Sequence, residues 1–159
     1  MPRAFLGVVM AALLLSACYQ VSSPVVETGM AVPGWRDGVY GRDDGTQVDI
    51  RWDGEQGGYV IGAGGVVRLA RLNASLFVAD YQAERRIVLL ARMAENGDVV
   101  FLVPSAEAER HLTAQNHLSV RPGPIPRLDG SSASVRRYFQ DLATQAELTE
   151  AARLRWLHS

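Results

Sequence analysis

The sequence has 159 residues, 48% of them hydrophobic, and its 16 arginines and 17 acidic residues give a formal net charge of −1. This near-neutral charge excludes the basic surface that is typical of nucleic-acid-binding proteins. Lysine does not occur in the chain, which rules out reactions that need its amine, such as Schiff-base chemistry or the lysine of a phosphate-binding P-loop.

The first 18 residues have the layout of a secretory signal peptide. A positive charge at Arg3 precedes an apolar run over residues 4–14, which small residues follow. That run is shorter than the ~20 residues that a membrane-spanning helix needs. The sequence Leu15-Ser16-Ala17-Cys18 resembles the lipobox of bacterial lipoproteins.

The resemblance implies cleavage between Ala17 and Cys18, a diacylglycerol on the Cys18 thiol and a further acyl chain on the new amine. Two or more chains give stable attachment to a membrane. In the same family an aspartate after the cysteine marks retention in the inner membrane, and this chain has Tyr19 there. The resemblance therefore implies an outer-membrane lipoprotein that faces the periplasm. Cys18 is the single cysteine, so we expect no internal disulfide.

We divide the chain into a signal peptide at 1–17, a lipidated tether at 18–34 and a single domain at 35–159. The tether is rich in Ser, Pro and Gly and shows no sustained period. The 142 residues that remain after removal of 17 from 159 are enough for one domain with a hydrophobic core.

The first part of the domain is predicted to form β-strands. Residues 46–53 alternate between apolar and polar side chains, the period of a half-buried strand. Asp44-Gly45, Asp53-Gly54 and Asn96-Gly97 are dipeptides that favour hairpin turns. We expect about seven strands in an up-and-down antiparallel meander, near 38–42, 46–52, 57–62, 66–72, 75–81, 86–93 and 98–103.

The later strands, at 76–79, 87–91 and 99–103, have apolar residues at both odd and even positions, which face opposite sides of a sheet. We therefore expect both faces of these strands to be covered. Ser105 predicts the N-cap of a helix that ends near Gln115. A short strand at 118–120 and the proline-rich segment 122–126 follow it.

A second helix is predicted from Ser131 or Ser132. Its apolar residues recur at spacings of three and four, and we leave open its continuation to Trp156. The stripe comprises Val135, Tyr138, Phe139, Leu142 and Ala146.

The predicted fold class is therefore α+β, with an open meander covered on one face by the C-terminal helices. The alternative is a small lipocalin-like barrel. Glycines that could bend the sheet sharply lie at positions 57, 58, 62, 64 and 65.

No motif predicts a metal site or another cofactor site. His111 and His117 are six residues apart, which does not place two ligands on one helix face, and His158 stands alone. An acidic group could in principle bind a hard cation, but it does not match an EF-hand loop and turn chemistry explains two of its members. The group comprises Asp43, Asp44, Asp49, Asp53 and Glu55.

Phosphate-loop and serine-hydrolase chemistry are disfavoured as well. The run Gly62-Ala63-Gly64-Gly65 leads into a predicted strand, whereas a dinucleotide site needs a helix there. No Gly-x-Ser-x-Gly elbow occurs, and Ser131 and Ser132 stand where a helix cap is expected.

Two further groups of residues have a structural and a functional interpretation. Paired arginines at 85–86 and 136–137, with Arg153 and Arg155, are either solvated charge or contacts to anionic lipid head groups or an acidic partner. Aromatic residues of the strands are either core or the lining of a ligand cavity. They are Tyr40, Trp52, Tyr59 and Tyr81.

The sequence thus favours a non-catalytic lipoprotein that binds another envelope protein or supports an envelope assembly. The alternative is a carrier of a small ligand with a lipocalin-like cavity, and an enzyme comes third. A cavity of at least ~300 Å³ with apolar walls would favour the carrier.

Overall fold

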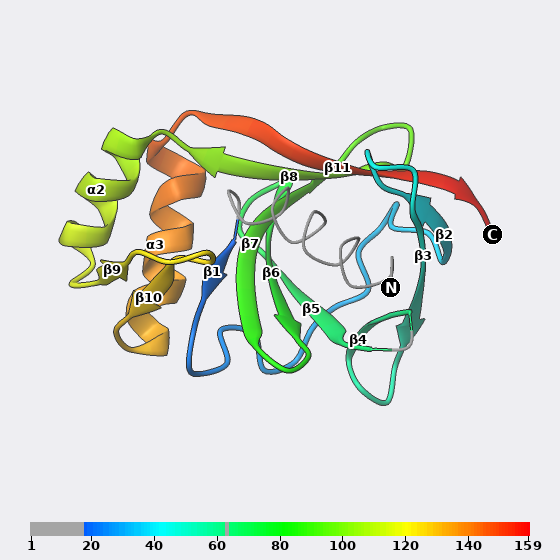
Figure 1. Ribbon diagram of the computed structural model, residues 1–159, viewed down its shortest axis with the longest axis horizontal. Coiled ribbons are helices and arrows are strands. Elements are labelled where there is room, and N and C mark those ends of the chain that lie inside the picture. The colour runs from blue at the N-terminus through cyan, green and yellow to red at the C-terminus, as the bar shows by residue number, and fades with distance from the viewer. Residues whose placement is uncertain (1–17, 63) are drawn as a thin grey trace, which may run out of the picture.

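The computed structural model describes residues 18–62 and 64–159, so the predicted signal peptide at 1–17 lies outside the described residues. Figure 1 shows a barrel of strands with two helices beside it. In chain order the elements are β1 (Tyr19–Gln20), β2 (Gly38–Gly41), β3 (Gln47–Asp53), β4 (Gly58–Ile61), β5 (Val66–Arg71), β6 (Leu76–Gln82), β7 (Arg86–Met93), β8 (Val99–Pro104), α2 (Ala106–Gln115), β9 (Ser119–Arg121), β10 (Arg127–Asp129), α3 (Ser132–Gln145) and β11 (Leu148–His158).

The sheet closes on itself. Each strand from β2 to β8 pairs antiparallel with the next one along the chain. Strand β11 then pairs with both β8 and β2, which completes a closed barrel of eight strands. The expectation of an open sheet is therefore wrong, and the small closed barrel that we held as the alternative fits the structure.

The closing strand β11 occupies residues that we considered as a continuation of the second helix. Helix α3 ends at Gln145, and the chain turns into a strand three residues later. Ala152, Leu154 and Trp156 alternate along β11 and pack against the core inside the barrel. Pairing with two neighbouring strands overrides the helix propensity of this alanine-containing segment.

A second layer covers the outside of the barrel along β6, β7 and β8. It contains α2, α3 and the short strands β1, β9 and β10 (Figure 1). Outward side chains such as Val88 and Leu90 belong to the core between the layers, whereas Leu89 and Phe101 belong to the core inside the barrel. These strands are apolar at odd and even positions because a hydrophobic core lies on each side of the barrel sheet.

Both helices begin where the sequence predicts. The Ser105 side chain accepts a hydrogen bond from the Ala108 backbone N–H, and the Ser131 side chain accepts one from the Ser134 N–H, each at 3.1 Å. These bonds satisfy N–H groups that a helix start leaves unpaired. In α3 the predicted stripe is buried at Val135, Tyr138, Phe139 and Leu142. Among the described helices, none has the length and apolar character required to cross a membrane.

The segment that we expected to be a tether packs against the domain. Tyr19 of β1 pairs with Val88 of β7. The pairing of β7 with β8 ends at Leu90, so β1 pairs with the part of β7 that β8 leaves free. Further along, the backbone N–H groups of Val25 and Val26 donate to the buried Asp80 carboxylate, at 2.7 and 2.9 Å. Apolar side chains and buried hydrogen bonds therefore hold residues 19–26 on the barrel, a difference from the expected tether.

Candidate ligand-binding site

The barrel contains a cavity of about 280 Å³. Its walls are mostly apolar and come from strands on opposite sides of the barrel. They include Ile50 of β3, Val67 of β5, Ala79 of β6, Leu89 of β7, Phe101 of β8 and Leu154 of β11. The volume is close to the lower end of the ~300 to 1,000 Å³ that ligand pockets commonly have. The barrel thus offers an apolar space large enough for a small molecule.

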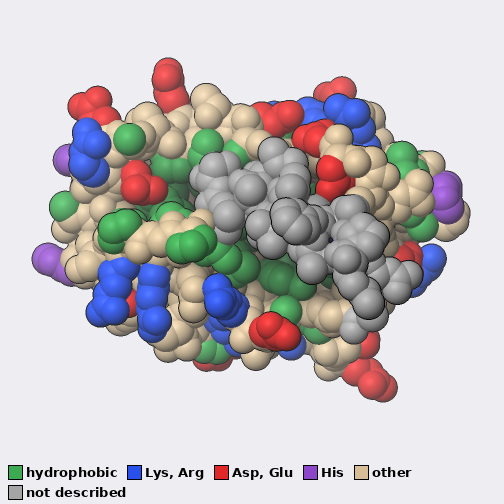
Figure 2. Space-filling view, viewed as in Figure 1, with side chains coloured by type: hydrophobic (Ala, Val, Ile, Leu, Met, Phe, Trp, Pro, Cys, Tyr) green, Lys and Arg blue, Asp and Glu red, His purple; other side chains and the backbone are tan. Residues whose placement is uncertain are grey.

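One end of the barrel, which we call the mouth, carries the turn at residues 42–46 between β2 and β3 and the start of β7. Arg42, Asp43 and Asp44 of this turn contribute to the cavity lining, as does Cys18 beside β7. Figure 2 shows hydrophobic side chains of described residues on the visible face, with most charged side chains toward its edges. The apolar lining of the cavity therefore ends at charged residues at the mouth.

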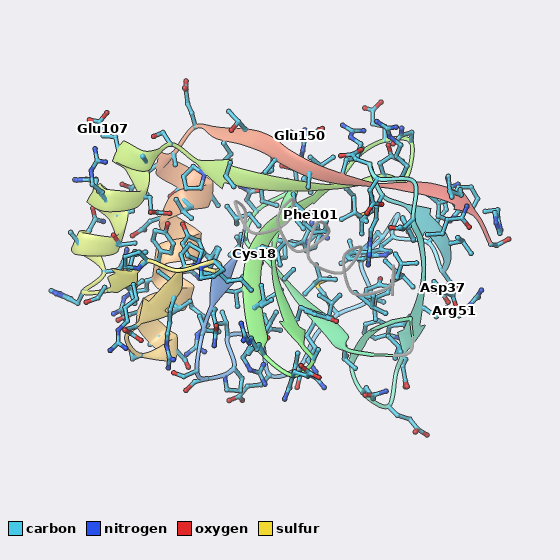
Figure 3. All side chains as sticks on the ribbon, viewed as in Figure 1. Cys18, Asp37, Arg51, Phe101, Glu107 and Glu150 are labelled. Carbon is cyan, nitrogen blue, oxygen red and sulfur yellow. The ribbon has the colours of Figure 1, made fainter. Side chains whose placement is uncertain are left out.

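Cys18 lies at this mouth and faces the barrel core. It is 7 % exposed and packs in the same cluster as Phe101. Figure 3 shows both residues in the barrel part of the molecule, away from the helices. Burial raises the pKa of the Cys18 thiol to about 12, so the free thiol stays protonated near neutral pH and is a poor nucleophile.

The opposite end of the barrel, which we call the base, is closed by aromatic side chains. The base carries the turn between β3 and β4. The segment between β1 and β2 reaches this turn, because the Gly29 backbone N–H donates to the Gly57 carbonyl at 3.0 Å. Trp35 follows in the same segment and stacks on Tyr59, with ring centroids 4.5 Å apart. The Tyr59 hydroxyl accepts a hydrogen bond from the Val32 N–H at 2.8 Å. Packed aromatic side chains therefore close the barrel at its base.

Of the four aromatic residues proposed from the sequence, one lines the cavity. Tyr81 is part of the lining, whereas Tyr40, Trp52 and Tyr59 pack in the core around it. Tyr40 donates a hydrogen bond to the Arg36 carbonyl at 2.7 Å. Sequence reasoning missed Trp35, which lines the cavity but precedes the first predicted strand and shows no alternation with its neighbours.

The acidic residues serve turns and ion pairs. The Asp44 carboxylate accepts hydrogen bonds from the Thr46 hydroxyl and N–H, which lower the pKa of Asp44. Asp53 accepts from the Glu55 N–H at 2.9 Å, and Asp49 pairs with Arg51 at 3.0 Å. Within residues 18–62 and 64–159, no three His, Cys, Asp or Glu side chains are grouped to hold a metal ion.

The histidines are exposed and lie on different elements. His111 is on α2, His117 follows that helix in a left-handed conformation with φ of 57°, and His158 ends β11. The loop at Gly62 leads from β4 into strand β5, so no helix N-terminus stands there to bind a phosphate. Ser131 caps α3. The structure brings none of these residues to the cavity.

The arginines divide into two groups. Arg86 pairs with the buried Asp80 at 2.8 Å, and Arg153 bridges Asp98 at 3.0 Å and Glu150 at 2.7 Å. These two therefore stabilise the fold. The others that we singled out lie in exposed positions, at 85, 136, 137 and 155.

Comparison of the chain with protein-family models, curated proteins and solved structures finds no match.

Proposed function

We propose that this protein is a lipoprotein that binds a small apolar ligand in its barrel, anchored to the outer membrane and facing the periplasm. The observation that carries the proposal is the apolar cavity of about 280 Å³ inside the closed barrel. The cavity is slightly smaller than the ~300 Å³ that we expected of a carrier, but its apolar walls support the ligand carrier over the envelope-protein partner.

The size of the cavity limits the ligand. Apolar cavities of ~150 Å³ hold one molecule of benzene. The cavity here is larger, at about 280 Å³, so it suits an apolar molecule of roughly a dozen carbon atoms by the same scale. The ligand we propose is therefore a short acyl chain or a small ring with an aliphatic substituent.

The position of Cys18 supports a link between anchoring and binding. Its side chain lines the mouth of the cavity, and Tyr19 is fixed in the barrel wall beside β7. A lipid attached to Cys18 would hold the mouth close to the bilayer surface. Apolar molecules concentrate in the bilayer, because transfer of apolar surface out of water is favourable. This geometry would let a ligand pass between membrane and barrel over a short path.

The polar groups near the cavity support binding over reaction. Arg153 is engaged by Asp98 and Glu150, and in the lipidated protein the Cys18 sulfur is a thioether, which is not a nucleophilic thiolate. In this proposal neither residue activates a bond in the ligand. The walls exclude water and select by size and apolar character.

The test uses calorimetric titration of butylbenzene into the full-length protein carrying Cys18→Ser, which prevents lipid attachment. We expect binding, and Ala79→Leu should weaken it at least tenfold, because the larger side chain fills space inside the barrel. Ala133→Leu, on the exposed side of α3, is the matched control and should bind like the parent. Absence of binding, or equal binding by Ala79→Leu, would overturn the proposed function.

A further inference from the structure

The side chain of Cys18 lies on the interior side of the barrel wall. Tyr19 pairs with Val88, and the side chains of both belong to the core between the barrel and the helices. Successive side chains along an extended chain point to opposite sides, so the side chain of Cys18 points toward the barrel interior. Cys18 accordingly packs in the core inside the barrel and lines its cavity.

The residues that follow Cys18 keep its sulfur at the mouth. The Gln20 backbone N–H donates to the Pro126 carbonyl at 2.8 Å, and the Val21 N–H donates to the Arg86 carbonyl at 3.1 Å. These bonds fix the chain one strand away from the cavity, with no flexible residues between the barrel wall and Cys18. A lipid bonded to the Cys18 sulfur therefore starts at the entrance of the cavity.

The walls near this entrance suit a hydrocarbon chain. Ile87 and Leu89 of β7 line the cavity, as does Ile125 of the segment before β10. The volume of about 280 Å³ has room for roughly a dozen carbon atoms on the benzene scale. A chain in this space would give the lining side chains van der Waals contacts that an empty cavity lacks.

We propose that one acyl chain of the lipid on Cys18 folds back into the barrel and is the resident occupant of the cavity. This inference rests on the lipid attachment and the cavity of the proposed function, and it adds regulation to that function. A chain tethered at the mouth has an effective concentration on the order of millimolar. A free ligand enters only when it displaces this chain, so weakly bound molecules are excluded.

Occupation of the cavity is compatible with attachment to the membrane. The lipid implied by the lipobox is a diacylglycerol on the thiol and a further acyl chain on the amine. One chain can therefore leave the bilayer while the others remain, and two chains are enough for stable attachment. The bilayer interior and the cavity walls are both apolar, so the exchange of a chain between them changes its exposure to water little.

The test uses a fatty acid with a photoactivatable diazirine on its chain, which cells attach to the full-length protein by metabolic labelling. Irradiation of the membranes is followed by mass spectrometry. A crosslink from the protein's own lipid joins the Cys18 peptide to a second peptide, whereas one from a free phospholipid does not. We expect such crosslinks at Leu89 and Phe101, which face the barrel interior, and none at Leu142 of α3.

Two variants separate the barrel interior from the membrane surface. Ala79→Leu fills part of the cavity and should lower these crosslinks about fivefold or more, whereas the exposed Ala133→Leu should not change them. Insertion of about ten glycine and serine residues between Cys18 and Tyr19 moves the lipid roughly 18 Å from the mouth on average. It should keep the protein on the membrane and lower the crosslinks to a similar extent, because the effective concentration of the chain falls.

The outcomes distinguish this inference from the carrier function. If the Cys18→Ser protein binds butylbenzene but the lipidated protein forms no crosslinks to Leu89 or Phe101, the inference is overturned and the carrier function stands. If those crosslinks form but the Cys18→Ser protein does not bind butylbenzene, the inference stands and the carrier function falls. Equal crosslinking in Ala79→Leu, or no label on the protein at all, would also overturn the inference.

Discussion

Cys18 and Tyr19 are neighbours in the chain but pack in two different hydrophobic cores. Cys18 belongs to the core inside the barrel, and Tyr19 to the core between the barrel and the helices. The Tyr19 hydroxyl hydrogen-bonds to Glu109 of α2 and, at 2.8 Å, to the hydroxyl of Tyr138 on α3. This contact with both helices holds the chain where it meets the barrel wall, and so fixes Cys18 at the mouth.

The first prediction concerns attachment through Cys18. Cys18→Ser should abolish metabolic labelling with fatty acid and release the protein from membranes, because no other cysteine thiol exists in the chain. Ser22→Ala, at an exposed position nearby, serves as the control and should stay labelled and membrane-bound. Recovery of the Cys18→Ser protein in the labelled membrane fraction would contradict lipid attachment at this residue.

The second prediction concerns the packing of α3. Phe139 and Leu142 are buried between the helices and the outer face of the barrel. Phe139→Ala or Leu142→Ala should lower the free energy of unfolding by about 2–5 kcal/mol, because each loses packing and leaves a cavity. Urea denaturation measures this change, and Gln140→Ala on the exposed side of α3 should have little effect. An unchanged unfolding midpoint in both core variants would show that the contact with the barrel contributes little.

The third prediction is a loss of stability at alkaline pH. Burial is the largest cause of a raised pKa at Tyr19, Tyr40, Tyr59 and Tyr138. For a group whose folded-state pKa is raised, the stabilisation is complete below the unfolded-state pKa, about 10 for tyrosine, and is lost as the pH rises toward the folded-state value. The free energy of unfolding should therefore fall above about pH 10.

Urea denaturation of the Cys18→Ser protein between about pH 8 and pH 11 checks this, because that background removes the thiol, whose pKa is also raised. Tyr138→Phe should lose less stability over the same range, since one of the buried phenols is gone. A free energy of unfolding that does not change with pH in this range would count against burial of neutral tyrosines.

The structure shows which parts of the fold the sequence pattern contains. Helix α3 could be predicted from the Ser131 cap and its stripe, and the strands from their alternation and turn dipeptides. The closing strand β11 could not, because its inward residues include the small Ala152, and alanine also favours a helix. The packing of Tyr19 and Trp35 depends on partners distant in the chain, at Tyr138 and Tyr59, which a local pattern does not reveal.

The candidate site was predictable to a similar degree. A cavity lined by strand residues was one of the alternatives, but the pattern did not show which aromatic residues would face it. Tyr59 looks like a lining residue from its alternation, yet Trp35 covers it by stacking. The sequence also placed Cys18 on a tether, whereas the pairing of Tyr19 with Val88 places Cys18 at the mouth.

The fourth prediction is that stability does not depend on a metal. The acidic residues Asp44, Asp49 and Asp53 already accept hydrogen bonds or pair with arginine. Addition of EDTA should therefore leave the melting temperature unchanged. A fall of more than ~5 °C, which corresponds to about 1 kcal/mol for a domain of this size, would show that a cation contributes to the fold.

The most direct test of ligand binding inside the barrel is an NMR measurement of contacts between butylbenzene and methyl groups of the full-length protein carrying Cys18→Ser. Leu89 and Leu90 are adjacent in β7 but face the barrel interior and the helical layer, respectively. We predict nuclear Overhauser effects from butylbenzene to the methyl groups of Leu89, Ile50 and Val67, and none to those of Leu90 or Val88. Contacts with Leu90 and Val88 in place of Leu89, or no contacts at all, would contradict a ligand site in the barrel.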